Sequence, residues 1–211
     1  GIAALAVASG QAAETLTLAT LLRQGDRIVS GSSLYGGTYN LFKVTLPRFG
    51  IETDFADAND PASFEAAITP DTKAIYLESL PNPMLDVPDY EAFAAIAKAH
   101  KLPLIVDNTA ASPALVRPLE HGADIVLNSA TKYIGGHGQG VGGVIVAGGS
   151  FDWTNGTFPE FTQPNPGYHG IVLSEAFGQL AFILKARVEM LRDMGPAMSP
   201  YNARYFLTGV E

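Results

Sequence analysis

The stretch that decides how this sequence is interpreted reads Asn128-Ser129-Ala130-Thr131-Lys132-Tyr133-Ile134-Gly135-Gly136-His137. It follows the short apolar segment 125–127, which predicts a buried strand. A lysine at a strand end, followed by glycines that let the backbone approach a ligand closely, suits Schiff-base chemistry. The alternative is an ordinary surface lysine in a loop, where most lysines lie. The residues at the ends of the other strands decide between the two.

An aspartate ends another expected strand. Asp107 follows the apolar run 104–106 and precedes Lys132 along the chain. Pyridoxal phosphate (PLP) chemistry requires such a pair, because the carboxylate keeps the pyridine nitrogen protonated and the lysine holds the aldehyde as an imine. Together, Asp107 and Lys132 therefore predict a PLP site.

Composition limits the other possibilities. The 211 residues are 47% hydrophobic and 16% charged, which fits one good-sized globular domain or two small ones. The net charge of −8 argues against nucleic acid or an anionic membrane as the main partner. The sequence has no cysteine, which excludes disulfides, thiolate–zinc sites and cysteine nucleophiles. No apolar run approaches the roughly 20 residues that span a bilayer. We expect a cytoplasmic protein that acts on small molecules.

Strand-like and helix-like segments alternate, which predicts an α/β fold with a mainly parallel sheet. The expected strands are residues 1–8, 27–30, 51–55, 74–78, 102–107, 125–127 and 141–147. The expected helices are residues 11–22, 39–46, 61–67, 88–100 and 174–194. The segment 148–168 is rich in Gly, Pro and aromatic residues without periodicity, so we expect a long loop or excursion there. The polar motifs fall at strand ends, where open α/β sheets bind ligands.

One strand-to-helix junction could hold a phosphate. Gly10 and Gln11 lie at the start of the first expected helix, whose free amides and positive dipole end suit an anion. Ser129 and Thr131 would add hydroxyl donors to the same group. The alternatives are an ordinary turn at the junction and ordinary strand-end capping by the two hydroxyls.

Three further residues are candidates for contact with a ligand. Tyr35 is followed by two glycines, which would let its ring lie against a flat ligand. Glu78 and Asn82 follow another expected strand and would contact a substrate or the phenolic oxygen of the cofactor. The alternatives are a tyrosine that packs over a turn and a pair that caps a Pro-rich turn.

None of the four histidines has metal-site spacing, so no metal is expected. His100 and His121 are interpreted as helix-end residues, and His137 as a residue that could line the site. The run 138–143 matches the dinucleotide fingerprint G-x-G-x-x-G, which would favour a nucleotide-binding oxidoreductase. That fingerprint must open a helix, whereas this run leads into an apolar strand, so we reject it.

Six motifs together resemble the Cys/Met metabolism (transsulfuration) family of PLP-dependent enzymes, which have the fold-type I, aspartate aminotransferase-like architecture. The matching motifs are Ala8-Ser9-Gly10-Gln11-Ala12-Ala13, Leu22-x-x-Gly25-Asp26, Tyr35-Gly36-Gly37-Thr38, Glu78-x-x-Pro81-Asn82-Pro83, Val106-Asp107-Asn108-Thr109 and Ser129-Ala130-Thr131-Lys132-Tyr133-Ile134-Gly135-Gly136-His137. They run in family order along nearly the whole chain. The resemblance implies a large-domain sheet of seven strands.

Within that family the chain is most similar to the O-acetylhomoserine sulfhydrylase branch. The excursion at about 148–170 resembles the insert of that branch, and Asn40 stands where other members commonly carry an arginine. The resemblance implies a γ-replacement in which sulfide or methanethiol displaces acetate from O-acetylhomoserine, giving homocysteine or methionine. A methionine or cystathionine γ-lyase, a cystathionine γ-synthase, and a non-catalytic domain that assembles with other chains remain alternatives.

The resemblance also implies a role for each matching residue. Lys132 would carry PLP and move protons, Asp107 would pair with the pyridinium nitrogen, and Tyr35 would stack on the ring. The phosphate would be held by Gly10, Gln11, Ser129 and Thr131. Asn82 would lie near the phenolic oxygen or the substrate carboxylate, with Glu78 in support.

The family context implies an active site shared between subunits, in a dimer of dimers. Both ends of the sequence look cut, so we expect a fragment. Residues 1–195 would form the PLP-binding large domain. Residues 196–211 would begin the connection to a C-terminal domain.

Overall fold

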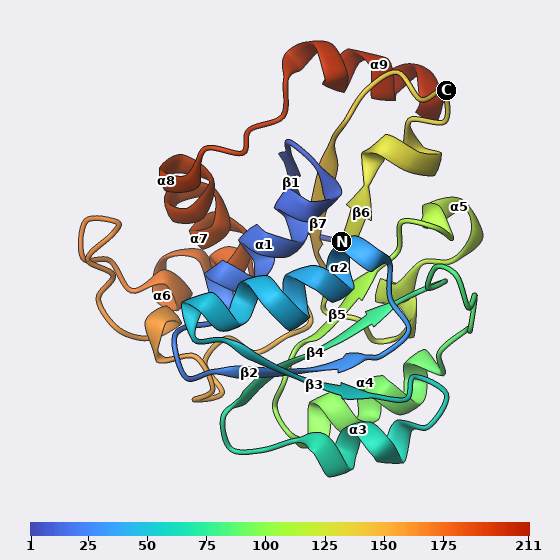
Figure 1. The fold of residues 1–211 in the computed structure, drawn as a ribbon. Coiled ribbons are helices and arrows are strands. Elements are labelled where there is room, and N and C mark those ends of the chain that lie inside the picture. The colour runs from blue at the N-terminus through green and yellow to red at the C-terminus, as the bar shows by residue number, and fades with distance from the viewer. The chain divides into compact units, whose positions relative to one another are not determined.

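The computed structural model describes residues 1–211 and contains a seven-stranded sheet in the order β1-β7-β6-β5-β4-β2-β3 (Figure 1). The strands are β1 (Ala3–Val7), β2 (Arg27–Gly31), β3 (Glu52–Ala56), β4 (Thr72–Glu78), β5 (Leu104–Asp107), β6 (Ile125–Ser129) and β7 (Gly143–Ala147). Each of them overlaps an expected strand. Strand β1 pairs antiparallel with β7, whereas the pairs of β2 with β3, β2 with β4 and β4 with β5 are parallel. The expected mainly parallel α/β sheet is confirmed.

The chain divides into two compact units, which we describe separately. The first unit comprises Gly1–Leu21 and Leu127–Glu211, and the second comprises Leu22–Val126. In the second unit, α3 (Pro61–Ala67) and α4 (Tyr90–Ala99) pack against each other and against strands of the sheet (Figure 1). Phe64 and Phe93 meet edge to face at this contact, with ring centroids 4.7 Å apart. Aromatic burial of this kind stabilises the layer of helices on the sheet.

Capping residues set where these two helices begin. The Asp60 side chain accepts the amide of Ala62, with Pro61 in the first turn, so α3 has the expected bounds. Asp89 accepts the amide of Ala92 at 3.1 Å, so α4 begins at Tyr90 and not at residue 88 as the sequence predicted. An N-cap carboxylate satisfies an amide that has no partner within the helix.

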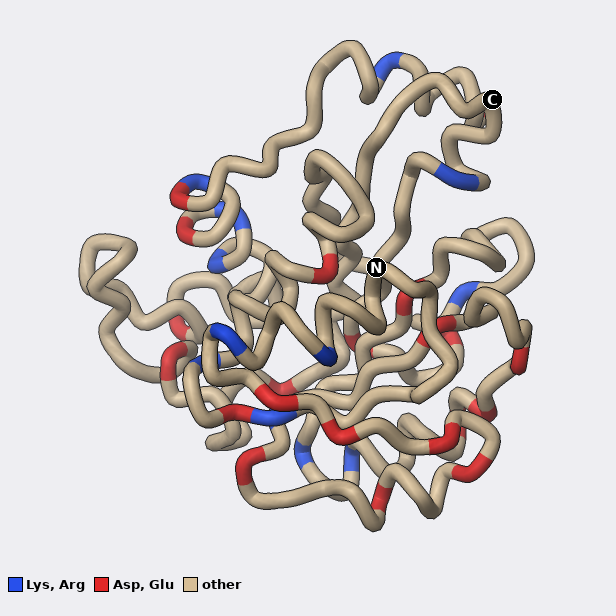
Figure 2. Tube along the Cα trace, in the orientation of Figure 1, with Lys and Arg blue, Asp and Glu red and all other residues tan.

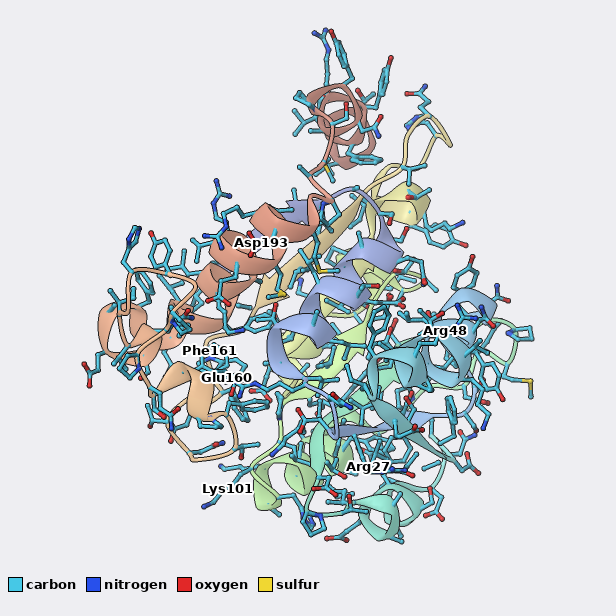
Figure 3. The ribbon with its side chains drawn as sticks, turned by 60° about the vertical axis from the view of Figure 1, so that its left-hand side comes forward. Arg27, Arg48, Lys101, Glu160, Phe161 and Asp193 are labelled. Atoms are coloured by element: carbon cyan, nitrogen blue, oxygen red, sulfur yellow. The ribbon has the colours of Figure 1, made fainter.

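Other helical segments of the second unit depart from the prediction. The helix expected at 39–46 begins earlier, as α2 (Gly36–Asn40), and continues through η1 (Leu41–Thr45) and η2 (Leu46–Phe49). Two short helices, α5 (Ser112–Leu115) and η3 (Pro118–His121), lie where none was expected. Arg27 (labelled in Figure 3) lies near the sheet edge. Its guanidinium binds both carboxylate oxygens of Asp54, with N–O distances of 2.7 and 2.6 Å. This bidentate pair joins β2 to β3.

In the first unit, α1 (Gly10–Leu21) and α7 (Ala181–Lys185) both pack against β7. The single helix expected at 174–194 is wrong, because Gly178 has a φ of 53° and interrupts it. The segment forms α6 (Leu173–Phe177), η6 (Gly178–Leu180), α7, η7 (Ala186–Leu191) and α8 (Arg192–Met194). A further helix, α9 (Pro200–Val210), was not predicted.

The excursion between β7 and α6 is packed by its aromatic side chains. It contains one short helix, η5 (Pro159–Phe161), and a bridge between Pro164 and Val172. Trp153 is 5% exposed and stacks on Phe182 of α7, with centroids 5.3 Å apart. The other members of this cluster are Phe151, Phe158 and Phe161. Their burial explains why a segment without periodicity holds a defined path.

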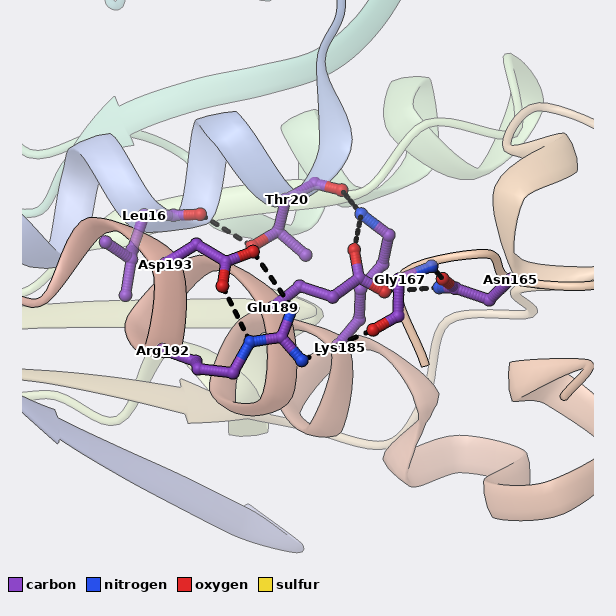
Figure 4. A network of polar contacts seen from close by, with 8 residues as sticks. All are labelled: Leu16, Thr20, Asn165, Gly167, Lys185, Glu189, Arg192 and Asp193. Atoms are coloured by element: carbon purple, nitrogen blue, oxygen red, sulfur yellow. Dashed lines mark hydrogen bonds and ion pairs between the residues drawn. The ribbon is translucent and has the colours of Figure 1, made fainter. Parts of the chain in front are cut away.

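A buried polar network also holds the excursion (Figure 4). Lys185 donates to the carbonyl of Thr20 at 3.0 Å and lies 3.4 Å from a carboxylate oxygen of Glu189. The other oxygen of Glu189 accepts from Asn165, whose own side-chain oxygen accepts the amide of Gly167 at 2.7 Å. The network therefore links the end of α1, the helical segment 181–191 and the excursion.

Charge is unevenly distributed along the chain. Most of the acidic surplus belongs to the second unit, where acidic residues recur on loops and helix starts (Figure 2). The first unit carries few charged residues of either sign. No helix of the structure combines the length and the apolar character that crossing a membrane requires.

Candidate active site

In the first unit, the start of α1 touches the end of β6. Ser9 caps α1, since its hydroxyl accepts the amide of Ala12 at 3.0 Å. A Cβ built on Gly10 would lie 2.7 Å from the Cβ of Ser129 and 3.1 Å from its hydroxyl oxygen. Glycine is therefore required at position 10, because a larger residue would push the two elements apart. The structure thus brings together Gly10 and Ser129, two of the residues predicted to surround a phosphate, with Gln11 next to Gly10 in the first turn.

This junction fits the phosphate group of PLP. The first-turn amides of a helix point outward from its N-terminus, where the helix dipole is positive. Gly10 and Gln11 occupy that turn of α1, a helix of 12 residues, and the Ser129 side chain adjoins it. Backbone amides and a hydroxyl are the donors that a phosphate requires.

The hydroxyl of Thr131 forms hydrogen bonds with the backbone of Gly142, in the glycine run that follows. Its hydroxyl accepts the amide of Gly142 at 3.1 Å and lies 3.3 Å from the carbonyl of the same residue. A hydroxyl has one hydrogen to donate, and here the carbonyl of Gly142 receives it. The role of Thr131 as a phosphate ligand stays a prediction, and its observed role is to tie β6 to the segment that enters β7.

Lys132 lies in η4 (Ala130–Ile134), immediately after β6, and its side chain is exposed. Its backbone, with φ −91° and ψ −119°, interrupts the helical turn. The turn closes through a 2.8 Å hydrogen bond from the amide of Gly136 to the Lys132 carbonyl, and Gly136 has a φ of 70° that suits glycine. His137 Nδ1 lies 3.0 Å from the carbonyl of Gly135, within the same turn. The glycines thus shape the turn that presents the lysine.

A substitution tests the junction directly. We expect Gly10→Ala to weaken binding of PLP by about tenfold or more, because the new methyl group collides with Ser129 and displaces the first-turn amides. Fluorescence titration of the purified protein with PLP measures the affinity. Gly156→Ala is the control, because the new Cβ has no neighbour within 4 Å. Its φ of 92° is strained for alanine, so this variant tests the effect of a destabilising substitution that causes no collision. An affinity unchanged in Gly10→Ala would argue against phosphate binding there.

The second unit holds the other predicted residues, and two of its carboxylates lie side by side. Glu78 and Asp107 are register partners at the ends of the parallel strands β4 and β5. Both are buried, with exposures of 9% and 7%. The amide of Thr109 donates to Asp107 Oδ1 at 2.8 Å, which fixes the orientation of that carboxylate. Asp107 therefore lies at a strand end with its carboxylate held in one orientation, an arrangement that suits the predicted pairing with a ring nitrogen.

Glu78 accepts hydrogen bonds from two segments of the chain. Its Oε1 accepts the amide of Tyr35 at 2.9 Å, and the carboxylate also accepts from the hydroxyl of Thr38 and the amide of Asn82. Burial raises the pKa of Glu78 to about 8, with a further contribution from the charge of Asp107, while the three hydrogen bonds lower it. A carboxyl with such a pKa changes its charge near neutral pH, which is typical of functional sites.

The Tyr35 ring lies against Gly37, the second of the two glycines that follow it. A Cβ built on Gly37 would lie 2.5 Å from Cε1 of Tyr35, so the ring occupies the space that a side chain would need. Tyr35 is 48% exposed, which leaves much of its ring surface available for stacking. Asn82 is also exposed. The structure therefore brings Tyr35, Glu78, Asn82 and Asp107 together at the ends of β4 and β5.

Several residues of the site were missed by the sequence analysis. No role was predicted for Thr38, yet it is fully buried and donates a hydrogen bond to Glu78. The contact between Thr131 and Gly142 was also unforeseen. A threonine that directly follows two glycines was the available sequence signal for such a buried hydrogen-bonding residue. His100 and His121 lie away from these groups and contact Glu65 and Glu91, as helix-end residues.

Comparison with known proteins agrees with this geometry. The family model described as Cys/Met metabolism PLP-dependent enzyme matches residues 1–211. The chain is 53% identical over 219 residues to O-acetyl-L-homoserine sulfhydrylase of Leptospira meyeri, covering 100% of this chain and 50% of the relative. It is 53% identical over 214 residues to homocysteine synthase of Schizosaccharomyces pombe, with 100% and 50% covered. The chain thus spans about half the length of the curated relatives it matches.

A solved structure supports the same comparison. The chain superposes on a Campylobacter jejuni protein assigned as an O-acetylhomoserine (thiol)-lyase, with a TM-score of 0.94 and 37% identity. The match covers 98% of this chain and 51% of the other. That structure carries N′-pyridoxyl-lysine-5′-monophosphate.

Proposed function

This chain belongs to the Cys/Met metabolism family of PLP-dependent enzymes, and from that premise we propose that it forms the cofactor-binding part of an O-acetylhomoserine sulfhydrylase. The proposed reaction replaces the acetate of O-acetylhomoserine with sulfide, or with methanethiol, to give homocysteine or methionine. One observation carries the proposal: the chain aligns over its whole length with relatives named for this activity. Since it spans about half of those relatives, the assays below use the complete gene product.

The proposed roles are given for two sets of residues, one in each unit. Gly10, Gln11 and Ser129 would hold the phosphate, and Lys132 would bind the cofactor covalently. Asp107 would face the ring nitrogen, where its negative charge keeps the ring protonated, and Tyr35 would stack on the ring. Bound PLP supplies an electron sink for the pair left on the substrate carbon when a proton is removed. The Lys132 amine would accept that proton and return one at the end of the reaction.

The family match and the lysine-bound pyridoxyl group of the solved relative support covalent binding of PLP. The assignment of each side chain rests on the motifs and on the local geometry within each unit. The division into a large domain at 1–195 and a connection at 196–211, a homotetramer with shared sites, and a cytoplasmic location stay predictions.

Product analysis tests the proposed reaction. With O-acetylhomoserine, sulfide and PLP, we expect the complete gene product to form homocysteine and acetate in equal amounts. The alternative γ-lyase activity would release a keto acid from methionine or cystathionine. The proposed sulfhydrylase should therefore give little keto acid when incubated with either amino acid alone. Keto acid formed from either amino acid faster than homocysteine from O-acetylhomoserine would favour the lyase. Cystathionine formed from O-acetylhomoserine and cysteine in preference to homocysteine would favour the synthase.

A further inference from the structure

We infer that Glu78 is a positioning residue, which holds the Tyr35 segment (residues 35–38) and the turn after β4 (residues 79–82) beside Asp107 at the strand ends. We call this arrangement the clamp. The functional consequence rests on the proposed function, since Tyr35 and Asn82 are two of its proposed site residues. The clamp itself is a property of the second unit and can be tested without cofactor.

The first argument is the number and origin of the hydrogen bonds. The amide of Tyr35 reaches Glu78 from a residue 43 positions away in sequence, and Thr38 bonds to the same carboxylate from the same segment. The amide of Asn82 reaches it from the opposite direction along the chain. One carboxylate thus serves as the common acceptor for two segments that carry proposed ligand-contacting groups. The two oxygens of a carboxyl group have enough lone pairs to accept from all three donors.

The second argument is that the amides of Tyr35 and Asn82, which donate to Glu78, lie outside the helices and strands. Tyr35 precedes α2, and residues 79–82 follow the last residue of β4. Backbone amides that point at a buried carboxylate are fixed by it, because no water replaces the acceptor if the side chain is removed. The exposed parts of Tyr35 and Asn82 are therefore anchored by their own backbones to one side chain.

The third argument is the place of Asp107. It is the register partner of Glu78 on β5, and it is the charged group that adds to the raised pKa of Glu78. The clamp therefore holds Tyr35 and Asn82 at a fixed position relative to the carboxylate proposed to face the ring nitrogen. A change at Glu78 should alter both the mobility of the two segments and the electrostatic environment of the bound cofactor.

Hydrogen exchange followed by mass spectrometry tests the clamp on cofactor-free protein. We expect Glu78→Gln to speed amide exchange by roughly tenfold or more in the peptides containing Tyr35 and Asn82, since one acceptor oxygen is lost and two donors are added. Thr38→Val removes one partner and should affect the Tyr35 peptide alone. Glu65→Gln, at an exposed glutamate, should leave both peptides unchanged. Faster exchange in only one of the two peptides of the Glu78→Gln variant would overturn the inference. An equal change in both peptides of the Thr38→Val variant would overturn it as well.

A spectroscopic measurement separates positioning from a purely structural role. In the PLP-loaded complete gene product, we expect Glu78→Gln to shift the pH midpoint of the visible cofactor band, because a carboxyl that ionises near neutral pH is removed from beside Asp107. Thr38→Val, which keeps both carboxylates, should leave that midpoint in place. A midpoint unmoved by Glu78→Gln would reduce Glu78 to a structural residue and overturn its positioning role. A wild-type protein without any band would instead count against the proposed function, because the exchange experiment does not involve the cofactor.

Discussion

Lys132→Ala is expected to abolish the visible absorption band that PLP gives on covalent binding to the wild-type protein. It should also lower homocysteine formation by a factor on the order of 10³ or more. Alanine has no amine to form an imine and none to transfer a proton, so both functions are lost together. The turn that presents the residue is formed by main-chain hydrogen bonds and by Gly136, so the fold should survive. Absorption spectra at saturating PLP, with product assays on the same samples, measure both effects.

Two controls sharpen this test. Lys98→Ala removes an exposed lysine from α4 and should change neither the band nor the rate. Lys132→Arg keeps the positive charge but cannot form the imine, so it should lose the band as the alanine variant does. Persistence of the full band in Lys132→Ala would place the covalent attachment on another lysine and refute the proposed role.

The strands were predicted well because their signal is local. Buried runs such as Ile125–Leu127 and Leu104–Val106 are apolar over their whole length, and the chain around them alternates with helical segments. Motif residues at strand ends were therefore placed correctly along the chain, and Ser9 caps α1 at the first of these junctions. Strand neighbours are not local information, so the adjacency of Glu78 and Asp107 follows only from the register of β4 and β5.

The errors have physical causes that a sequence pattern does not reveal. The apolar periodicity of 174–194 continues through Gly178, whose positive φ divides the helix. Glycine is tolerated in a helix as well as in a left-handed turn, so the residue type alone does not decide. The excursion after β7 lacked periodicity because its aromatic side chains pack as a cluster around Trp153, an arrangement with no repeat along the chain.

The roles of hydroxyl residues were the least predictable part of the site. Ser129 and Thr131 belong to one motif and were expected to act alike. Ser129 adjoins Gly10 at the start of α1, whereas the hydroxyl of Thr131 is bonded to the backbone of Gly142. Two positions apart, the residues have different partners, because the chain turns between them. A side-chain hydrogen bond of this kind depends on a segment that a local pattern does not include.

The second large effect is expected in the buried network of the first unit. Lys185→Met should lower the free energy of unfolding by about 3–5 kcal/mol, because it leaves the charge of Glu189 buried without its cation. Both residues are less than 10% exposed, so water replaces the lost partner poorly. Urea unfolding followed by Trp153 fluorescence measures the loss, and that residue lies in the aromatic cluster that the network supports.

A second substitution distinguishes the stranded charge from lost packing. Lys185→Met combined with Glu189→Gln should recover about 1–2 kcal/mol, since glutamine removes the charge and keeps an oxygen that accepts from Asn165. Arg187→Met, at an exposed position of the same helical segment, should change stability by no more than about 0.5 kcal/mol. If the double variant were no more stable than Lys185→Met alone, the loss would come from packing of the lysine side chain. The buried ion pair would then contribute little to holding the excursion on α1.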